Sequence, residues 1–237
     1  MGIEYIGAMA DLVPRHQLAR ITQLLNAQYM NTFGSTETGT PPASAGAIAI
    51  GDKPVDLAKA ITNFCEIRLV DADDIDVPDG EPGELLIRGP SLFSGYWRND
   101  VANEEAFRGG WFHMGDVFRR EADGRINFVD RVKYMIKSGG ENIYPAEIEQ
   151  VVLADDRVVE AAVVRRADDR WGEVPVIFVA RNDESFDAGA LLERCRAELA
   201  GYKLPKAVFF IEADEFPRSS TGKVERHNLE ARLTATK

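Results

Sequence analysis

The sequence predicts a protein that combines the α/β and α+β classes, with a β-rich first part and a smaller α+β second part. Short runs of alternating apolar and polar residues, separated by polar turns, fill most of residues 64–131, as expected for antiparallel strands. Beyond them, apolar runs typical of strands alternate with amphipathic runs typical of helices. Because the pattern changes at residues 130–133, we expect two domains, 1–130 and 131–237.

The first part opens with one predicted helix. In residues 14–26, PRHQLARITQLLN, the apolar side chains recur at helical spacing after a proline, a residue favoured in the first turn of a helix. A segment dense in Gly, Ser, Thr and Pro follows. From about residue 45 to residue 130 we expect a β-rich subdomain, a small barrel or sandwich, with strands in FCEIRLVD and ELLIRG and a hairpin turn at Asp123-Gly124.

The second part alternates strands with helices. Strands are predicted in VVEAAVVRR, VPVIFVA and AVFFI. Helices are predicted from Pro145, in DAGALLERCRAEL with Asp187 as the N-cap, and in VERHNLEARL. This alternation in a short region predicts helices packed on one sheet.

Composition limits the function classes. Of the 237 residues, 45% are hydrophobic and 28% are charged, which is typical of a globular protein. The formal net charge of −11 disfavours nucleic-acid binding, and no apolar run is long enough to span a membrane. The N-terminus lacks the basic and apolar regions of a signal peptide. We therefore expect a cytoplasmic protein with no nucleic-acid partner and no membrane span.

The two cysteines, Cys65 and Cys195, do not suggest a structural or metal role. They lie far apart and neither belongs to a CxxC pair, so no disulfide framework or zinc site is predicted. Both are expected to be small buried side chains.

The segment NTFGSTETG, residues 31–39, is a turn rich in glycine and hydroxyl side chains, with one acid, Glu37. Backbone amides and hydroxyls of such a turn can hold a phosphate, and an adjacent carboxylate can bind the Mg²⁺ that accompanies ATP. A solvated turn without a ligand fits the same residues.

Two further segments carry candidate ligands for a nucleotide. In GWFHMGD, residues 110–116, Asp116 follows a glycine at an expected strand start, where a carboxylate can accept both ribose hydroxyls or simply cap a turn. In FPRSSTGKVER, residues 216–226, Lys223 ends a flexible polar loop. This loop is not a P-loop, because the first glycine of that motif is missing and Val224 replaces its Ser or Thr. A mobile lysine can still present its charge to a phosphate or carboxylate.

Six ordered motifs resemble one family over nearly the whole chain. They are FGSTETG, GELLIRGPSLFSGYW, EEAFRGGWFHMGD, DGRINFVDRVKYMIKSGGENIYPAEIE, YKLPKAVFF and PRSSTGKVER. The chain thereby resembles the C-terminal portion of an AMP-forming acyl-CoA synthetase of the adenylate-forming superfamily, which also includes luciferases and the adenylation domains of peptide synthetases. The resemblance implies the remnant of a large N-terminal domain, followed by a small, mobile C-terminal domain.

The resemblance also implies a two-step ligase reaction. A carboxylic acid attacks the α-phosphate of ATP to give an acyl-adenylate and pyrophosphate. The thiol of coenzyme A then attacks this mixed anhydride, which gives the thioester and releases AMP. Phe33 would stack on adenine, Thr36 would contact the α-phosphate and Glu37 would bind Mg²⁺. Asp116 and Arg131 would bind the ribose hydroxyls. The full nucleotide-binding set implied in this way is Gly7, Ala8, Phe33, Gly34, Thr36, Asp116 and Arg131.

Two lysines would serve the two steps. By the resemblance, Lys223 would bridge carboxylate and phosphate oxygens during adenylation. The family rotates its small domain between the half-reactions, and the position of its hinge corresponds to Lys133. The loop IKSGGENI would then replace Lys223 and bring Lys137 near the reacting centre. Gly139 and Gly140 would leave room for the thiol, because glycine allows close approach of another group. The residues implied along the path of CoA are Gly139, Gly140 and Glu141.

One segment of the family has no counterpart in this sequence. Family members carry, before the region matched here, a Ser/Thr/Gly-rich loop that binds the ATP β- and γ-phosphates, together with most of the acyl pocket. We therefore expect a fragment, or one piece of a split enzyme with a missing N-terminal portion, that is inactive alone. Two alternatives stay open: an adenylation module that loads a carrier protein, and an inert fragment or complementing subunit. Fatty, aryl and short branched acids all remain compatible as substrates.

Overall fold

The computed structural model describes residues 2–7, 13, 15–220 and 222–234. The chain divides into two compact units, Met1–Val132 and Lys133–Lys237, which are described separately below. The observed division falls two residues after the expected one between residues 130 and 131.

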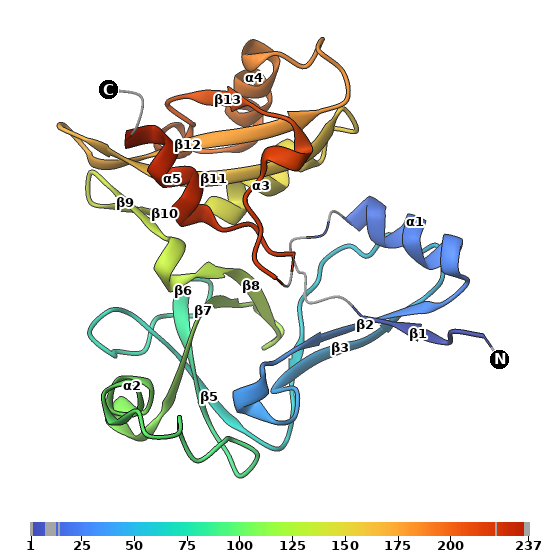
Figure 1. Cartoon of the computed structure of the whole chain (residues 1–237). Coiled ribbons are helices and arrows are strands. Elements are labelled where there is room, and N and C mark those ends of the chain that lie inside the picture. The colour runs from blue at the N-terminus through green and yellow to red at the C-terminus, as the bar shows by residue number, and fades with distance from the viewer. Residues whose placement is uncertain (1, 8–12, 14, 221, 235–237) are drawn as a thin grey trace. The chain divides into compact units, whose positions relative to one another are not determined.

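Unit 1 begins with a four-stranded sheet and one helix (Figure 1). The strands lie in the order β1 (Tyr5–Ile6), β2 (Gln28–Phe33), β3 (Ala43–Ile48) and β4 (Ala60–Ile61). Because β1 and β2 are parallel, a crossover must join them, and α1 (Arg15–Leu25) lies in it. The helix predicted at residues 14–26 is confirmed, and it buries Leu18 and Thr22.

The second sheet of unit 1 is antiparallel throughout. Its strands lie in the order β5 (Glu66–Val70), β6 (Pro82–Arg88), β7 (Phe112–Arg120) and β8 (Ile126–Arg131). The predicted turn between β7 and β8 is confirmed, because Gly124 has a φ of +84° and its amide bonds to the carbonyl of Glu121. The sheet packs on a core of Ala43, Leu69, Leu85, Ile87, Phe118 and Ile126.

Unit 1 contains one helix that the sequence did not predict, α2 (Asp100–Ala106). Asn99 caps it by accepting a hydrogen bond from the amide of Ala102 at 3.2 Å. No residue of α2 is buried, so the sequence has no apolar periodicity at this position. The described part of the unit also contains the 3₁₀ turns η1 (Thr36–Thr38) and η2 (Arg108–Gly110).

Unit 2 is built on one mixed sheet (Figure 1). Its strands are β9 (Ile136–Ser138), β10 (Glu141–Ile143), β11 (Val158–Asp168), β12 (Gly172–Arg181) and β13 (Val208–Phe210), in the order β10-β9-β12-β11 with β13 paired to β12. The helices are α3 (Pro145–Leu153), α4 (Ala188–Glu198) and α5 (Arg226–Thr234). The 3₁₀ turns are η3 (Val132–Tyr134), which begins at the last residue of unit 1, η4 (Gly201–Lys203) and η5 (Ala213–Glu215). The helices and strands predicted for this part are confirmed, including Asp187 as the N-cap of α4.

Helices cover both faces of the unit 2 sheet. On one face, Val163 and Ile177 pack with Ile148 of α3 and Leu191 of α4. On the other face, the alternate strand residues pack with Leu229 of α5. Burial on both faces explains why the strand run VPVIFVA is apolar without alternation.

The segment IKSGGENI, expected as a loop, forms a hairpin of β9 and β10. Gly139 and Gly140 connect the strands with φ values of +59° and +90°. Two consecutive positive φ angles are what the tightest hairpin turns require, and glycine adopts them with least strain. In the part of the chain that the structure describes, no helix is long and apolar enough to cross a membrane.

Candidate functional site

The turn that follows β2 is held by its own side chains. The Thr38 hydroxyl accepts a hydrogen bond from the Ser35 amide at 3.1 Å and donates one to the Ser35 carbonyl at 2.9 Å. Thr38 is buried, whereas Thr36 is exposed and Glu37 is half-buried. The structure therefore presents Thr36 and Glu37 on a turn fixed by Thr38, a residue to which the sequence analysis assigned no role.

The carboxylate of Glu37 is held in its charged form. Its pKa lies below the ordinary value, chiefly because of the Ser35 hydroxyl, with smaller contributions from the Tyr96 hydroxyl and the Arg131 charge. Tyr96 donates to Glu37 Oε1 at 3.2 Å, and the amide of Phe93 donates to the Glu37 carbonyl at 2.8 Å. Residues 93–96, which follow β6, thus support the acid from the side chain and the backbone.

The residues predicted to surround adenine are described only in part. Ala8 lies outside the described residues, and Gly7 is exposed. Phe33, at the end of β2, is half-buried and meets the ring of Phe118 edge-on at 4.6 Å between centroids. Gly34 follows, and a side chain there would crowd Thr38 Oγ1 at 3.2 Å. The turn is therefore seated directly against the core of the second sheet.

Asp116 and Arg131 form an ion pair across β7 and β8. They are direct partners in the strand register, and Arg131 Nε lies 2.9 Å from Asp116 Oδ1. The Asp116 side chain is 4% exposed, whereas that of Arg131 is 43% exposed. Asp116 was expected at a strand start, but it lies inside β7. The glycine before it does not start the strand but belongs to a bulge within it.

The bulge in β7 sets the direction of the Asp116 side chain. Leu86 pairs with His113 and Glu84 pairs with Val117, so three residues of β7 lie opposite one of β6 at this point. Gly115, in the bulge, has a φ of +73° and donates its amide to Glu84 Oε1 at 3.2 Å.

Glu84 connects the bulge to two further groups. Its other oxygen, Oε2, lies 3.2 Å from Arg108 Nη2 and 3.3 Å from His113 Nδ1. Glu84 is not among the residues predicted from the sequence, although an acid directly before the apolar run Leu85–Ile87 was a usable signal. A carboxylate that is 14% exposed needs such partners.

In unit 2, the hairpin that carries Lys137 rests on the turn between β11 and β12. The Lys137 amide donates to Glu173 Oε2 at 3.0 Å, and the Gly139 amide donates to the Trp171 carbonyl at 2.8 Å. A Cβ on Gly139 would lie 2.5 Å from the Trp171 ring. The side chain of Lys137, together with Gly139, Gly140 and Glu141, is exposed.

Lys223 lies in a tight loop before α5. The Ser219 amide donates to the Lys223 carbonyl at 2.9 Å, and the Gly222 amide donates to the Ser219 carbonyl at 2.9 Å. Arg218 donates to the Gly222 carbonyl at 3.1 Å and pairs with Glu160 of β11. The backbone of the loop is thus tied down, while the Lys223 side chain is exposed.

Lys133, the predicted hinge, is the first residue of unit 2. Its side chain is exposed, with Nζ 4.8 Å from the centre of the Tyr134 ring. Its carbonyl accepts a hydrogen bond from Arg165 Nη2 at 2.8 Å.

The described residues contain no cluster of three or more His, Cys, Asp or Glu side chains that could enclose a metal ion. Mg²⁺ that arrives with a nucleotide needs only one or two protein carboxylates, because phosphate and water supply its other ligands. A single half-buried, ionised acid such as Glu37 fits that requirement.

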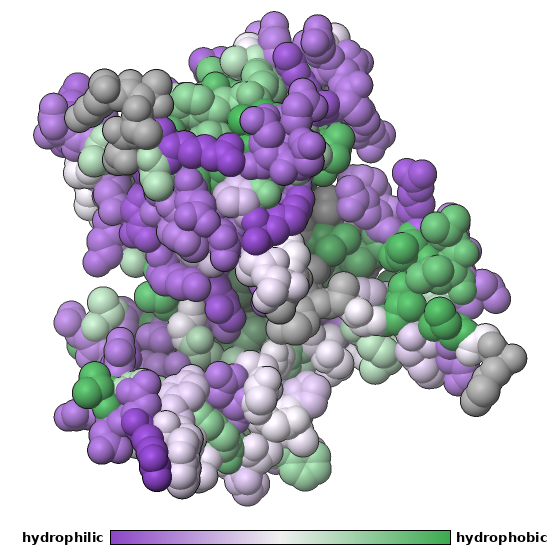
Figure 2. Space-filling model, in the orientation of Figure 1, coloured by the Kyte–Doolittle hydropathy of each residue, from purple (hydrophilic) through white to green (hydrophobic). Residues whose placement is uncertain are grey.

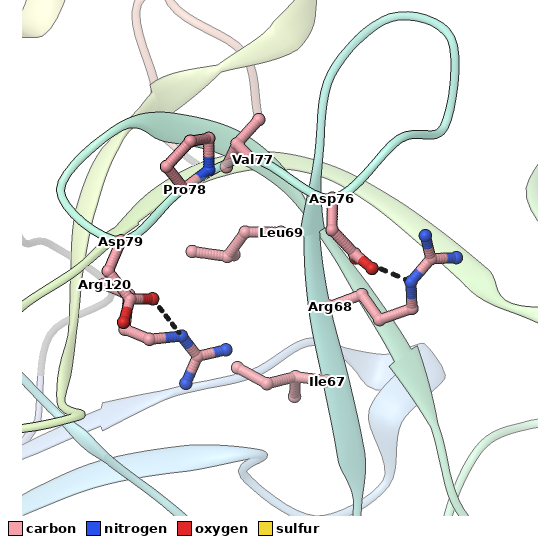
Figure 3. Close-up of a pocket in the computed structure, with 8 residues that line it drawn as sticks. All are labelled: Ile67, Arg68, Leu69, Asp76, Val77, Pro78, Asp79 and Arg120. Atoms are coloured by element: carbon pink, nitrogen blue, oxygen red, sulfur yellow. Dashed lines mark hydrogen bonds and ion pairs between the residues drawn. The ribbon is translucent and has the colours of Figure 1, made fainter.

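A surface pocket of about 260 Å³ lies on the second sheet of unit 1 (Figure 3). Two ion pairs border it, Arg68 with Asp76 at 2.8 Å and Arg120 with Asp79 at 3.4 Å. None of its lining residues is a predicted site residue. Because both arginines already have carboxylate partners, the pocket is not a candidate anion site.

Comparison with known families matches both units. The model of the AMP-binding enzyme family matches residues 2–97, and that of the AMP-binding enzyme C-terminal domain matches residues 147–223. Indoleacetate–CoA ligase of Aromatoleum aromaticum is 38% identical over 93% of this chain and 42% of its own length. Long-chain-fatty-acid–CoA ligase of Escherichia coli is 44% identical over 69% of this chain and 29% of its own length.

Solved structures agree with this match. The anthranilate CoA ligase structure with anthranoyl-AMP has a TM-score of 0.82 at 26% identity, and covers 99% of this chain and 46% of its own. The o-succinylbenzoate CoA synthetase of Bacillus subtilis, with its acyl-adenylate, has a TM-score of 0.77 at 30% identity. The match covers 95% of this chain and 45% of the synthetase chain. The same enzyme is also known with ATP and magnesium. The chain thus spans less than half the length of these relatives.

Proposed function

The chain belongs to the AMP-binding enzyme family of adenylate-forming CoA ligases, and we propose that it supplies the nucleotide-binding and mobile parts of one. The enzyme would activate a carboxylic acid with ATP and transfer the acyl group to coenzyme A. The observation that carries the proposal is the ion pair of the buried Asp116 with Arg131. The charge of the same arginine also helps to lower the pKa of Glu37.

In this proposal, unit 1 binds the nucleotide. The Asp116 carboxylate accepts the ribose hydroxyls, and Arg131 holds that carboxylate in place through its Nε contact at 2.9 Å. Thr36 donates its exposed hydroxyl to the α-phosphate. The adenine base would contact Phe33 and Gly34, together with Gly7 and Ala8. Glu37 holds Mg²⁺, which when bound neutralises phosphate charge.

Lys223 is proposed as the cation for adenylation. Negative charge develops on the α-phosphate oxygens in that step, and a positioned cation stabilises it. The Lys223 side chain is exposed on a loop whose backbone is held by Ser219 and Arg218. Such a loop can offer the ammonium group to a separate site without first ordering the backbone.

Thioester formation is proposed to use the hairpin of β9 and β10. Unit 2 would turn about Lys133, so that Lys137 and the glycines take the place of Lys223. Gly139 and Gly140 leave the hairpin tip without side chains, and Glu141 follows them. Coenzyme A could then approach the adenylate carbonyl closely along this tip.

The acceptor and the acid are proposed from the relatives. The named relatives are ligases of CoA with indoleacetate, long-chain fatty acids and 2-succinylbenzoate. We therefore infer CoA, and not a carrier protein, as the thiol, and an aryl or fatty acid as the substrate. A cytoplasmic location, where ATP and CoA are both present, is part of the same proposal.

An exposed apolar face of unit 1 supports a requirement for a further stretch of polypeptide. On α1, Ile21, Leu24 and Leu25 lie at the spacing of one helix face and are 39%, 77% and 41% exposed. Figure 2 shows hydrophobic residues gathered around α1. Because relatives are more than twice as long as this chain, we propose that such a segment, in the same or another polypeptide, covers this face.

Calorimetry tests this requirement. AMP is titrated into the chain alone, and again after addition of the part of the Aromatoleum ligase that precedes the matching region. We expect AMP to bind more tightly after addition. Leu24→Glu should abolish this increase in affinity, because it places a charge on the exposed apolar face, where Leu24 is 77% exposed. Asp116→Asn should abolish binding, whereas Asp123→Asn, on the exposed turn after β7, should not. AMP binding that survives Asp116→Asn would contradict the site.

Exchange of pyrophosphate into ATP tests Lys223 in the assembled enzyme. Lys223→Ala should slow exchange by roughly 100-fold or more, and Lys206→Ala, an exposed lysine of the same unit, should not. Lys133→Pro should impair one half-reaction selectively by locking the hinge. Unchanged exchange in Lys223→Ala would reject the role of that lysine.

A further inference from the structure

Arg165 lies where the hinge and both proposed catalytic segments of unit 2 meet. It is on β11, with its side chain 38% exposed. Each of its three guanidinium nitrogens faces a different acceptor. Nη2 donates to the Lys133 carbonyl at 2.8 Å, Nε donates to Glu230 Oε1 at 3.1 Å, and Nη1 lies 3.7 Å from Glu173 Oε1.

Each acceptor belongs to a different functional segment. Lys133 is the first residue of unit 2 and the predicted hinge. Glu230 is on α5, the helix that directly follows the Lys223 loop. Glu173, on β12, uses its other oxygen to accept the Lys137 amide at 3.0 Å.

We propose that Arg165 is a positioning residue that joins the hinge carbonyl to the segments carrying Lys137 and Lys223. This inference rests on the proposed function for the roles of those two lysines and for Lys133 as the hinge. The bracing keeps Lys133 with unit 2, so bending is confined to the bonds before it. The two segments then move as one body when unit 2 turns.

A second arginine strengthens the same arrangement. Arg226, the first residue of α5, lies over the ring of Tyr134 with 4.8 Å to the ring centre. It also pairs with Glu149 of α3. The two residues after the unit boundary, Lys133 and Tyr134, are thus each held by an arginine that also contacts the rest of unit 2.

The geometry requires arginine at position 165. A planar guanidinium offers donors in several fixed directions, whereas the lysine ammonium concentrates its donors on one nitrogen. Arg165→Lys keeps the positive charge but cannot reach the three acceptors through separate nitrogens. It separates the loss of the hinge bond from the loss of charge.

Hydrogen exchange followed by mass spectrometry tests the proposal on the chain itself. In Arg165→Gln, amides in residues 130–138 and 226–234 should exchange roughly three- to tenfold faster, because both segments lose a bond to the same side chain. Glu230→Gln should accelerate exchange in residues 226–234 alone. The matched control is Arg166→Gln, since successive side chains of a strand point to opposite faces.

Two results would overturn the proposal. One is equal exchange in Arg165→Gln and Arg166→Gln, and the other is acceleration in residues 226–234 without any in 130–138. If Arg165→Gln does not fold, Arg165→Lys is read in the same way, with acceleration expected in residues 130–138. No substrate is used, so this outcome is independent of pyrophosphate exchange, which tests the ligase function.

Discussion

The buried ion pair between Glu149 and Arg226 should be the main electrostatic support of unit 2. The two side chains are 5% and 11% exposed. Arg226 Nη2 donates to Glu149 Oε2 at 2.9 Å, and Glu149 Oε1 also accepts the Val163 amide at 2.6 Å. The pair therefore ties α3 and α5 to β11 through one carboxylate.

Glu149→Gln removes the charge but keeps an oxygen for the Val163 amide. It leaves the Arg226 guanidinium buried without its counter-ion, and breaking a buried pair in this way costs about 3–5 kcal/mol. The same substitution in the exposed pair of Arg194 and Glu198, where Glu198 is 53% exposed, should cost only about 0.3–0.5 kcal/mol. Glu198→Gln is therefore the matched control.

Urea denaturation measures the difference. Trp171 is the tryptophan of unit 2, so its fluorescence follows that unit when Trp97 and Trp111 are replaced by Phe in every variant. We expect the free energy of unfolding to fall by about 3 kcal/mol or more in Glu149→Gln. A loss below about 1 kcal/mol, close to that of Glu198→Gln, would refute the assignment of this pair as a buried support.

Three further predictions concern backbone conformation, pH and thiol reactivity. Both Gly139 and Gly140 have positive φ, but only a Cβ on Gly139 would contact Trp171, at 2.5 Å. Gly139→Ala should therefore lower the melting temperature more than Gly140→Ala, and equal shifts in a thermal melt would contradict this prediction. The Arg157 hydrogen bond lowers the pKa of Asp155 from 3.8 to about 2, so the stabilisation by this bond is present above about pH 4 and is lost as the pH falls towards about 2. The difference in unfolding free energy between wild type and Asp155→Asn should therefore shrink over that range, and a constant difference would contradict the prediction. Burial raises the pKa of Cys195 to about 11, so iodoacetamide at pH 8 should label it only after unfolding, as peptide mass spectrometry would report; rapid labelling of the native chain would disprove this.

Much of unit 2 was predictable because its elements obey local rules. The amphipathic run of α4 begins at Asp187, whose carboxylate accepts the Ala190 amide at 2.8 Å, as a side-chain cap does. The apolar runs of β11 and β12 are long enough to specify strands. By contrast, α2 buries no residue, so its sequence had no periodicity from which a helix could be predicted.

Within the candidate site, the sequence identified residues that carry chemistry more readily than residues that support them. Glu37 stands out as the one acid of a turn rich in glycine and hydroxyl residues, and Asp116 as an acid directly after a glycine. Thr38, Glu84 and Arg165 do not, because each acts on a segment distant in sequence or on backbone atoms. Their partners are defined only by strand register and bulges, which pattern analysis does not specify.

The sequence by itself determined the family, the two-part organisation and the candidate residues, because ordered motifs and local periodicity are written in the chain. Only the tertiary structure decided how those residues are held. It placed Asp116 within a strand, on a bulge supported by Glu84, and buried Lys59 completely with its Nζ bonded to the Leu57 carbonyl at 3.0 Å. It also brought the Lys133 carbonyl to Arg165. Such contacts join residues far apart in the chain, and their geometry follows from packing and register, not from local preference.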